Sequence, residues 1–255
     1  MTPRALVLRA AGTNCDRETV SALSAAGAGP ELLHLRELLA RPGRLESYRL
    51  LVIPGGFSYG DDVAAGRILA NELRFKLGSE LAGFVAKGRL VIGVCNGFQA
   101  LVKAGFLPGE GQGPAQTASL TDNDSGRFQC EWTGIRREDS RAEWLSGLPR
   151  SFELPIAHGE GRFVARDAGH LRSLFRKGQV VFRYHPKNPN GSQGSIAGIC
   201  NEGGNVVGLM PHPERYVNAF QHPAWTSIKS RHTTGGQAPG HLFWKSAADY
   251  AKGLS

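Results

Sequence analysis

Residues 88–105 read GRLVIGVCNGFQALVKAG, which predicts a buried strand that runs directly into a helix, with Cys95 at the turn between them. Glycines at 93 and 97 flank this cysteine in a G-x-C-x-G pattern, and residues without side chains let such a turn be tight. The first N–H groups of the following helix favour a thiolate over a thiol. A cysteine at the end of a strand is also a common small hydrophobic core residue. The local pattern therefore leaves two interpretations open, a nucleophile and a core residue.

Three further apolar runs predict the sheet around this strand. They are short, contain β-branched residues and are bounded by glycine or proline, which is typical of strands buried on both faces. Helix-like segments separate the first runs along the chain, so we expect an α/β fold with a single open, mostly parallel twisted sheet and helices on both faces. The runs are residues 5–10, 50–53 and 206–210.

An antiparallel portion is expected in the second half of the chain. Residues 127–135 alternate, with Phe128, Cys130 and Trp132 on one side, which predicts a half-buried strand. Segments 152–165 and 179–184 follow a similar pattern, and residues 196–210 are typical of a hairpin that turns at 202–205. We therefore expect added antiparallel strands beside the parallel sheet.

The chain length fits one domain. A chain of 255 residues is within the range of a single α/β domain, so we expect one domain over residues 1–255. Residues 226–240 are rich in Ser, Thr, Gly and Lys, which predicts a mobile loop, and a short helix over 241–251 is expected to end the chain.

Composition excludes several classes of function. The net charge is +8, but the lysines and arginines are scattered and match no nucleic-acid-binding motif, so we expect no nucleic-acid partner. No apolar stretch approaches a membrane span and the N-terminus lacks a signal-peptide core, so we expect no membrane association and a cytoplasmic location. The four cysteines are widely spaced without a C-x-x-C pair, which predicts free thiols and no metal site.

A thiolate nucleophile needs an acid or base partner, and the strand that ends near residue 210 delivers one. It continues into PHPER at 211–215, where the prolines stiffen the backbone and the i, i+2 spacing turns His212 and Glu214 toward the same side. A histidine beside prolines is more often a surface loop residue. The carboxylate at this spacing, after a buried strand, favours a pair in which Glu214 orients His212.

Both members of this pair have a rival elsewhere in the chain. His158, in AHGEGR at 157–162, also has a glutamate two residues on, and it could instead shape a pocket or contact a partner. Cys15 also lies at a strand-to-helix turn, but it lacks the flanking glycines of Cys95. The residues alone do not separate the two histidines.

Acyl transfer also needs donors for an oxyanion, and backbone N–H groups serve best. The turn PGGF at 54–57 follows a predicted strand, so Gly56 or Phe57 together with Asn96 are the expected donors. Open parallel sheets place active sites at the carboxyl edge of their strands. Three features at three strand ends therefore predict one site.

Taken together, five stretches of the chain resemble the class I, or triad, glutamine amidotransferases. They extend over nearly the whole chain in the order of that class. The cysteine elbow and the PHPE ending are typical of the class as a whole. The finer patterns GGFSYGD, CNGFQ and AHGEGR resemble its members that supply ammonia to purine biosynthesis. The stretches are residues 12–16, 54–62, 93–99, 155–162 and 208–215.

The resemblance implies a role for each matching residue. It implies Cys95 as the nucleophile, His212 as the acid and base, and Glu214 as the carboxylate that orients the histidine. It also implies that Gln99 contacts bound glutamine. The residues implied in a pocket or a partner interface are His158, Glu160 and Arg162.

The resemblance further implies an activity and its partners. Glutamine is hydrolysed to glutamate and ammonia through a cysteine thioester, and the ammonia passes to a separate synthetase subunit. No cofactor is expected in this chain, whereas ATP and Mg²⁺ are expected in the synthetase, and a small third subunit is a further expected partner. Two other hypotheses are a cysteine hydrolase without a partner and a glutamine-sensing regulatory subunit with a degenerate site. The intact Cys95, His212 and Glu214 set argues against the second.

Overall fold

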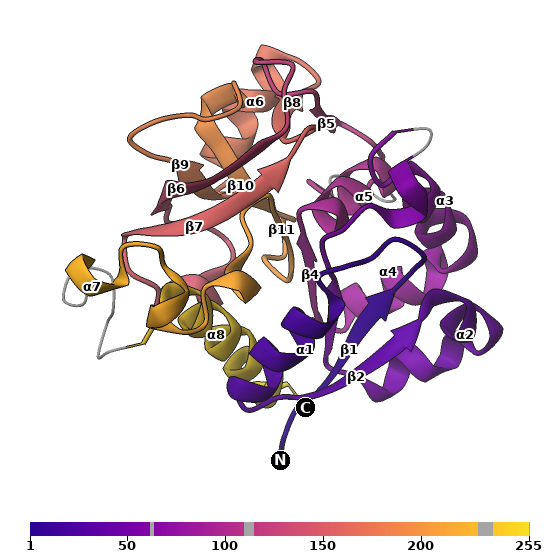
Figure 1. The fold of residues 1–255 in the computed structure, drawn as a ribbon. Helices are drawn as coiled ribbons and strands as arrows, with labels where there is room; N and C mark the ends of the chain where they lie inside the picture. Colours follow the sequence, from indigo (N-terminus) through magenta and orange to yellow (C-terminus); the bar gives the residue numbers. More distant parts are fainter. Residues whose placement is uncertain (62–63, 110–114, 229–236, 255) are drawn as a thin grey trace.

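The computed structural model describes residues 1–61, 64–109, 115–228 and 237–254. Within them, nine strands form one sheet in the order β2-β1-β3-β4-β11-β10-β9-β6-β7, and β5 pairs with β8 in a second sheet (Figure 1). The first five strands in this order, β2, β1, β3, β4 and β11, run parallel to one another. The other four strands, β10, β9, β6 and β7, pair antiparallel with their neighbours. This arrangement confirms the predicted fold class. The strands are β1 (Arg4–Arg9), β2 (Gly29–His34), β3 (Leu50–Ile53), β4 (Leu90–Val94), β5 (Ala118–Thr121), β6 (Gln129–Arg137), β7 (Ser151–His158), β8 (Arg162–Ala165), β9 (Val180–Tyr184), β10 (Ile196–Cys200) and β11 (Val206–Leu209).

Helices cover the parallel strands on both faces, as predicted. Helices α1 and α8 pack together on one face, and α3, α4 and α5 lie on the other (Figure 1). Strands β3 and β4 are buried along their whole length between these layers, which accounts for their continuous apolar sequences. The helices are α1 (Asp16–Ala25), α2 (Leu35–Ala40), α3 (Arg67–Lys76), α4 (Gly78–Ala86), α5 (Asn96–Ala104), α6 (Ala168–Arg176), α7 (Trp225–Ile228) and α8 (Pro239–Gly253).

Helix α5 packs so closely on the sheet that three positions have no room for a side chain. A Cβ atom on Gly97, in the first turn of α5, would lie 1.9 Å from the carbonyl oxygen of Ile53 in β3. A Cβ on Gly208 in β11 would lie 2.1 Å from a ring carbon of Phe98. A Cβ on Gly93 in β4 would lie 2.7 Å from the carbonyl oxygen of Gly97. The start of α5 is therefore held against three neighbouring strands.

The predicted half-buried strand over 127–135 is present as β6, but the side that carries Phe128, Cys130 and Trp132 is the more exposed one. Phe128 is 54 % exposed and Cys130 is also exposed, whereas Thr133 is buried. Strand β6 pairs with β7 along its length but with β9 only from Ile135 onward. Its first half thus extends beyond the main layer of the sheet, where Phe128 and Cys130 are exposed and Trp132 is only partly buried against the core.

Both ends of the segment predicted as a loop, 226–240, are helical in the structure. Helix α7 includes residues 226–228, and α8 begins at Pro239 rather than at residue 241. Residues 229–236, which make up most of the predicted loop, lie outside the described residues. Among the described residues, no helix has the length and apolarity that crossing a membrane requires.

The packing of α5 predicts a steric effect at Gly97. Gly97→Ala forces a methyl group against the Ile53 carbonyl, so we expect the free energy of unfolding to fall by about 1–3 kcal/mol. Urea denaturation measures the change. Gly83→Ala, in helix α4, is the matched control because a Cβ there meets nothing within 4 Å. Its expected effect is a stabilisation of up to about 1 kcal/mol, and equal midpoints for the two variants would contradict the proposed packing.

Candidate active site

The ends of four parallel strands place the candidate residues side by side. In the sheet order β1-β3-β4-β11, Cys15 follows β1, Gly55 follows β3, Cys95 follows β4 and His212 follows β11. Strands β4 and β11 stay in register to their last residues, so these ends lie at the same level. This edge is where open α/β sheets carry their sites.

Cys95 occupies a strained turn between β4 and α5. Its φ is +51° and its ψ is −107°, a backbone conformation that residues with side chains rarely adopt. The Cys95 N–H donates to the carbonyl of Leu209 at 2.8 Å, and its own carbonyl accepts from the Gln99 N–H at 3.0 Å. The thiol contacts the carbonyl oxygen of Ala157 at 3.6 Å. Such strain at a nucleophilic side chain is typical of active sites.

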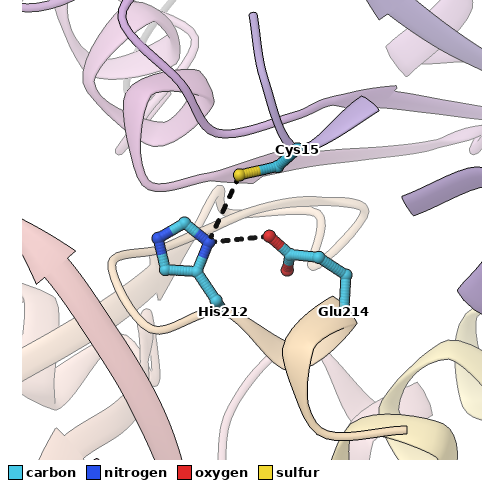
Figure 2. Close-up of side chains that lie close together, drawn as sticks. All are labelled: Cys15, His212 and Glu214. Carbon is cyan, nitrogen blue, oxygen red and sulfur yellow. Dashed lines mark hydrogen bonds and ion pairs between the residues drawn. The ribbon is translucent and has the colours of Figure 1, made fainter. Parts of the chain in front are cut away.

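His212 and Glu214 form a buried pair (Figure 2). The Nδ1 atom of His212 lies 2.7 Å from Oε1 of Glu214, and each residue is 2 % exposed. The predicted contact between the two side chains is confirmed. Burial acts to lower the pKa of His212, but the Glu214 carboxylate, followed by Cys95 and Cys15, raises this pKa well above its usual value. The direction of this shift favours the imidazolium form of His212.

Gly55 leaves room for these groups to meet. A Cβ atom on Gly55 would lie 2.8 Å from Cε1 of His212, 3.2 Å from Sγ of Cys15 and 3.4 Å from Cβ of Cys95. One edge of the imidazole and both cysteines thus surround a point that a side chain cannot occupy. Two of the three predicted catalytic residues, Cys95 and His212, thus approach each other at this point, and the third, Glu214, contacts His212 at Nδ1.

The two nitrogens of the His212 ring have different surroundings. Sγ of Cys15 lies 3.9 Å from Nδ1 of His212, the nitrogen that Glu214 also contacts (Figure 2). The same sulfur accepts a hydrogen bond from Nη2 of Arg215 at 3.2 Å, and burial is the main cause that raises the pKa of the Cys15 thiol. Nε2 of His212 has no hydrogen-bond partner among the described residues. This nitrogen is available to a nucleophile, and Cys95 has the turn geometry of one.

A cavity of about 210 Å³ opens onto these groups. Its lining includes Cys15, Cys95 and His212, together with the exposed residues Phe57 and Phe128, whose ring centroids are 6.4 Å apart. A larger hollow of about 680 Å³ lies beside α3 and has neither cysteine in its lining. The smaller cavity is the better candidate, because in it a thiol meets an imidazole.

The expected oxyanion donors are not equally available. The Phe57 N–H donates to the carbonyl of Gly12 at 2.9 Å, so this donor is engaged within the chain. Gly56 has a φ of +146°, and a Cβ there would lie 2.7 Å from the backbone nitrogen of Asn14. Asn96 is the first residue of α5, where N–H groups have no acceptor within the helix. Gly56 and Asn96 therefore remain the predicted donors, and Phe57 does not serve in this conformation.

A buried polar network lies behind Cys95. Nδ2 of Asn96 donates to Oδ1 of Asp61 at 3.1 Å and to Oε1 of Gln99 at 3.0 Å. Nε2 of Gln99 donates to the carbonyl of Glu160 at 2.6 Å. Both polar atoms of the Gln99 amide are thus engaged within the chain, and its contact with bound glutamine stays a prediction.

His158 does not form a histidine–glutamate pair like that of His212 and Glu214. It is 3 % exposed, and its Nδ1 lies 3.0 Å from Oδ1 of Asn123. Burial is the main cause that lowers its pKa to about 4, so the ring is neutral. The glutamate two residues on, Glu160, lies 3.6 Å from Nζ of Lys103 instead. His158 and His212 each have a glutamate two residues later in the sequence, but only His212 is in contact with its glutamate.

Two features of the site, the contact of Arg215 with Cys15 and the steric role of Gly55, were not predicted from the sequence. The role of a third residue, Arg162, stays a prediction. Arg215 follows Glu214 directly, but its contact with Cys15 joins residues 200 positions apart and has no local signal. The role of Gly55 was missed although it is part of the diglycine turn. Nε of Arg162 is buried without a hydrogen-bond partner in the described part of the chain, and the expected pocket or interface role of Arg162 stays a prediction.

Comparison with known proteins identifies relatives over nearly the whole chain. Residues 2–251 match the CobB/CobQ-like glutamine amidotransferase domain. A phosphoribosylformylglycinamidine synthase subunit PurQ from Dehalococcoides mccartyi is 45 % identical over 232 residues, covering 87 % of this chain and 89 % of the relative. The PurQ subunit from Treponema denticola is 46 % identical, covering 85 % and 89 %. A chain in the structure of PurLQS from Thermotoga maritima superimposes with a TM-score of 0.76 at 34 % identity, covering 98 % of this chain and 99 % of that one.

The buried pair predicts how His212 titrates. Glu214→Gln removes the carboxylate that raises the pKa of His212, so burial should dominate and this pKa should fall. NMR titration of the His212 ring measures the change. In the parent, the raised pKa stabilises the fold fully below the unfolded value of about 6.5, and this contribution is lost as pH rises through the folded value.

The matched control is Glu153→Gln. Glu153 contacts a different histidine, His222, at 3.1 Å, so His212 should titrate there as in the parent. An unchanged His212 midpoint in Glu214→Gln would show that the carboxylate does not set the charge of the ring.

Proposed function

The chain belongs to the family of CobB/CobQ-like glutamine amidotransferases, and we propose that it is the glutaminase subunit of a phosphoribosylformylglycinamidine synthase in de novo purine biosynthesis. One observation carries the chemistry. The strained Cys95 turn and the buried His212–Glu214 pair meet at Gly55, on the same edge of the sheet. A cysteine, a histidine and an orienting carboxylate in this arrangement perform acyl transfer.

In the first step the Cys95 thiolate attacks the side-chain amide carbon of glutamine. A new C–S bond forms and the carbonyl electrons move to oxygen. The N–H groups of Asn96 and Gly56 are the proposed donors to this oxyanion. A donor of this kind contributes roughly 2.7–4 kcal/mol to the lowering of the barrier.

In the second step the imidazolium of His212 supplies the proton for the leaving group. As the C–N bond breaks, Nε2 gives its proton to the departing ammonia and a glutamyl thioester remains. The now neutral imidazole accepts a proton from water, which attacks the thioester and releases glutamate and the Cys95 thiolate. Glu214 stabilises the charged ring through Nδ1, so the raised pKa of His212 suits its role as the acid.

The proposed partners follow from the fate of ammonia. We place its use in a separate synthetase subunit that holds ATP and Mg²⁺, and a small third subunit completes the assembly. The relative in the Thermotoga maritima structure is part of PurLQS, which supports this assignment. Exposed Phe57 and Phe128 at the mouth of the cavity offer apolar surface to a partner. We further place the reaction in the cytoplasm.

Replacing the nucleophile should separate the two half-reactions. Cys95→Ala should lower the turnover number for glutamine hydrolysis by about a million-fold. Synthesis from added ammonium salts should continue in the reconstituted complex. Glutamate release and amidine formation, measured in parallel, test both expectations.

Cys15→Ala is the matched control. Its sulfur makes only weak contacts with His212, so the loss should stay within about tenfold, equivalent to one hydrogen bond. If Cys15→Ala were inactive and Cys95→Ala were active, the nucleophile would have been assigned to the wrong turn. Strong glutaminase activity of the isolated chain, without a rise on adding the synthetase, would favour a hydrolase that needs no partner.

The space at Gly55 predicts a second kinetic effect. Gly55→Ala places a methyl group 2.8 Å from Cε1 of His212 and so displaces the ring from Cys95. We expect the turnover number to fall by about 100-fold, since a shift of about 1 Å in a catalytic group has this effect. Gly43→Ala, where a Cβ meets nothing within 4 Å, should retain parental turnover. Full activity in Gly55→Ala would argue against the proposed meeting point.

A further inference from the structure

Three side chains of different chemistry converge on the Glu214 side of the imidazole. Sγ of Cys15, Nδ1 of His212 and a carboxylate oxygen of Glu214 all lie within 4.8 Å of one another, and all three residues are buried (Figure 2). The second carboxylate oxygen, Oε2 of Glu214, is buried and has no hydrogen-bond partner among the described residues. Thiolate, imidazole and carboxylate are together the ligand types that Zn²⁺ prefers.

The spacing of these atoms approaches that of a tetrahedral zinc site. With Zn–S near 2.3 Å and Zn–N near 2.0 Å, sulfur and nitrogen ligands lie about 3.5 Å apart. The Cys15 sulfur and Nδ1 of His212 are 3.9 Å apart, which is long for a hydrogen bond and close to this spacing. The 2.7 Å contact between Nδ1 and Oε1 of Glu214 would open to about 3.4 Å. The two contacts at Nδ1 therefore each lie within about 1 Å of the spacing of a tetrahedral zinc site, and the third pair, Cys15 and Glu214, lies within 4.8 Å.

We propose that Cys15, His212 and Glu214 form an inhibitory binding site for a thiophilic divalent cation of the Zn²⁺ type, separate from the sulfur of Cys95. Binding releases the Cys15 thiol proton and the Nδ1 proton of His212 to solvent. The coordinated ring keeps a proton on Nε2 but is no longer an imidazolium, and Glu214 no longer orients it. The inhibitory effect rests on the proposed function, whereas the metal site itself does not.

Access and charge define the conditions for binding. The cavity of about 210 Å³ is lined by both Cys15 and His212, which gives the ion a route to the cluster. Nη2 of Arg215 is 3.2 Å from the Cys15 sulfur, and its positive charge opposes a cation. The Arg215 side chain is 33 % exposed and pairs with Glu18 at 2.9 Å, so it can move outward. Arg215→Leu should therefore tighten binding.

The test measures metal binding directly, in a background that lacks the proposed nucleophile. Cys95→Ala is titrated with Co²⁺, whose visible absorption reports thiolate coordination, and with Zn²⁺ as the competitor. We expect one site per chain. Adding Cys15→Ser should weaken binding by at least roughly 10- to 100-fold, the cost of changing even an outer-shell residue of a metal site. Cys130→Ser, which removes an exposed thiol, is the matched control and should leave binding unchanged.

Each outcome decides the proposal. Loss of binding with Cys15→Ser, its retention with Cys130→Ser and its increase with Arg215→Leu support it, provided that circular dichroism shows every variant folded. Absence of binding in Cys95→Ala, or binding that survives Cys15→Ser, overturns it. Because no step measures glutaminase activity, failure of the metal site is distinguishable from failure of the proposed function.

Discussion

The close packing of α5 on the parallel sheet is the constraint on which the site depends. Gly97 touches β3, and Gly93 and Gly208 let the helix approach β4 and β11, so the first turn of α5 has one position. That position places Cys95 at the carboxyl edge of the sheet, in the lining of the cavity and directly before the first turn of the helix. Since close-packed interiors shift little, the thiol is held in place before any ligand binds.

The charge of His212 results from two opposing effects of the same buried setting. Loss of water favours a neutral ring, whereas the carboxylate at 2.7 Å, which has lost water too, favours an imidazolium. His158 has no such carboxylate and stays neutral, with a pKa of about 4. Two histidines with the same local spacing thus have pKa values shifted in opposite directions, and the difference lies in where the glutamate side chain points. The same imidazole also has the Cys15 thiol on its Glu214 side, 3.9 Å from Nδ1.

Much of the fold and part of the site could be predicted from local patterns. Buried strands with continuous apolar sequences, the glycines around Cys95 and the prolines around His212 all act over a few residues, and each was interpreted correctly as structure. Features that depend on distant segments could not be predicted. The faces of β6 follow from where β9 stops pairing, the steric role of Gly55 from three other strand ends, and the contact between Cys15 and Arg215 from the order of strands in the sheet. The wide spacing of the cysteines along the chain gave no sign that Cys15 lies beside His212 and Glu214 in the fold.

The three glycines that let α5 pack on the sheet and the thiol of Cys95 are subject to different constraints during evolution. Positions 93, 97 and 208 admit only glycine because a backbone or ring atom already occupies the space of a side chain, whatever the protein does with glutamine. Position 95 is restricted by its chemistry and by a positive φ that residues with side chains rarely adopt. A descendant that lost its cysteine would still keep the three glycines, so they mark the ancestry of the fold, whereas the cysteine marks whether the reaction has survived.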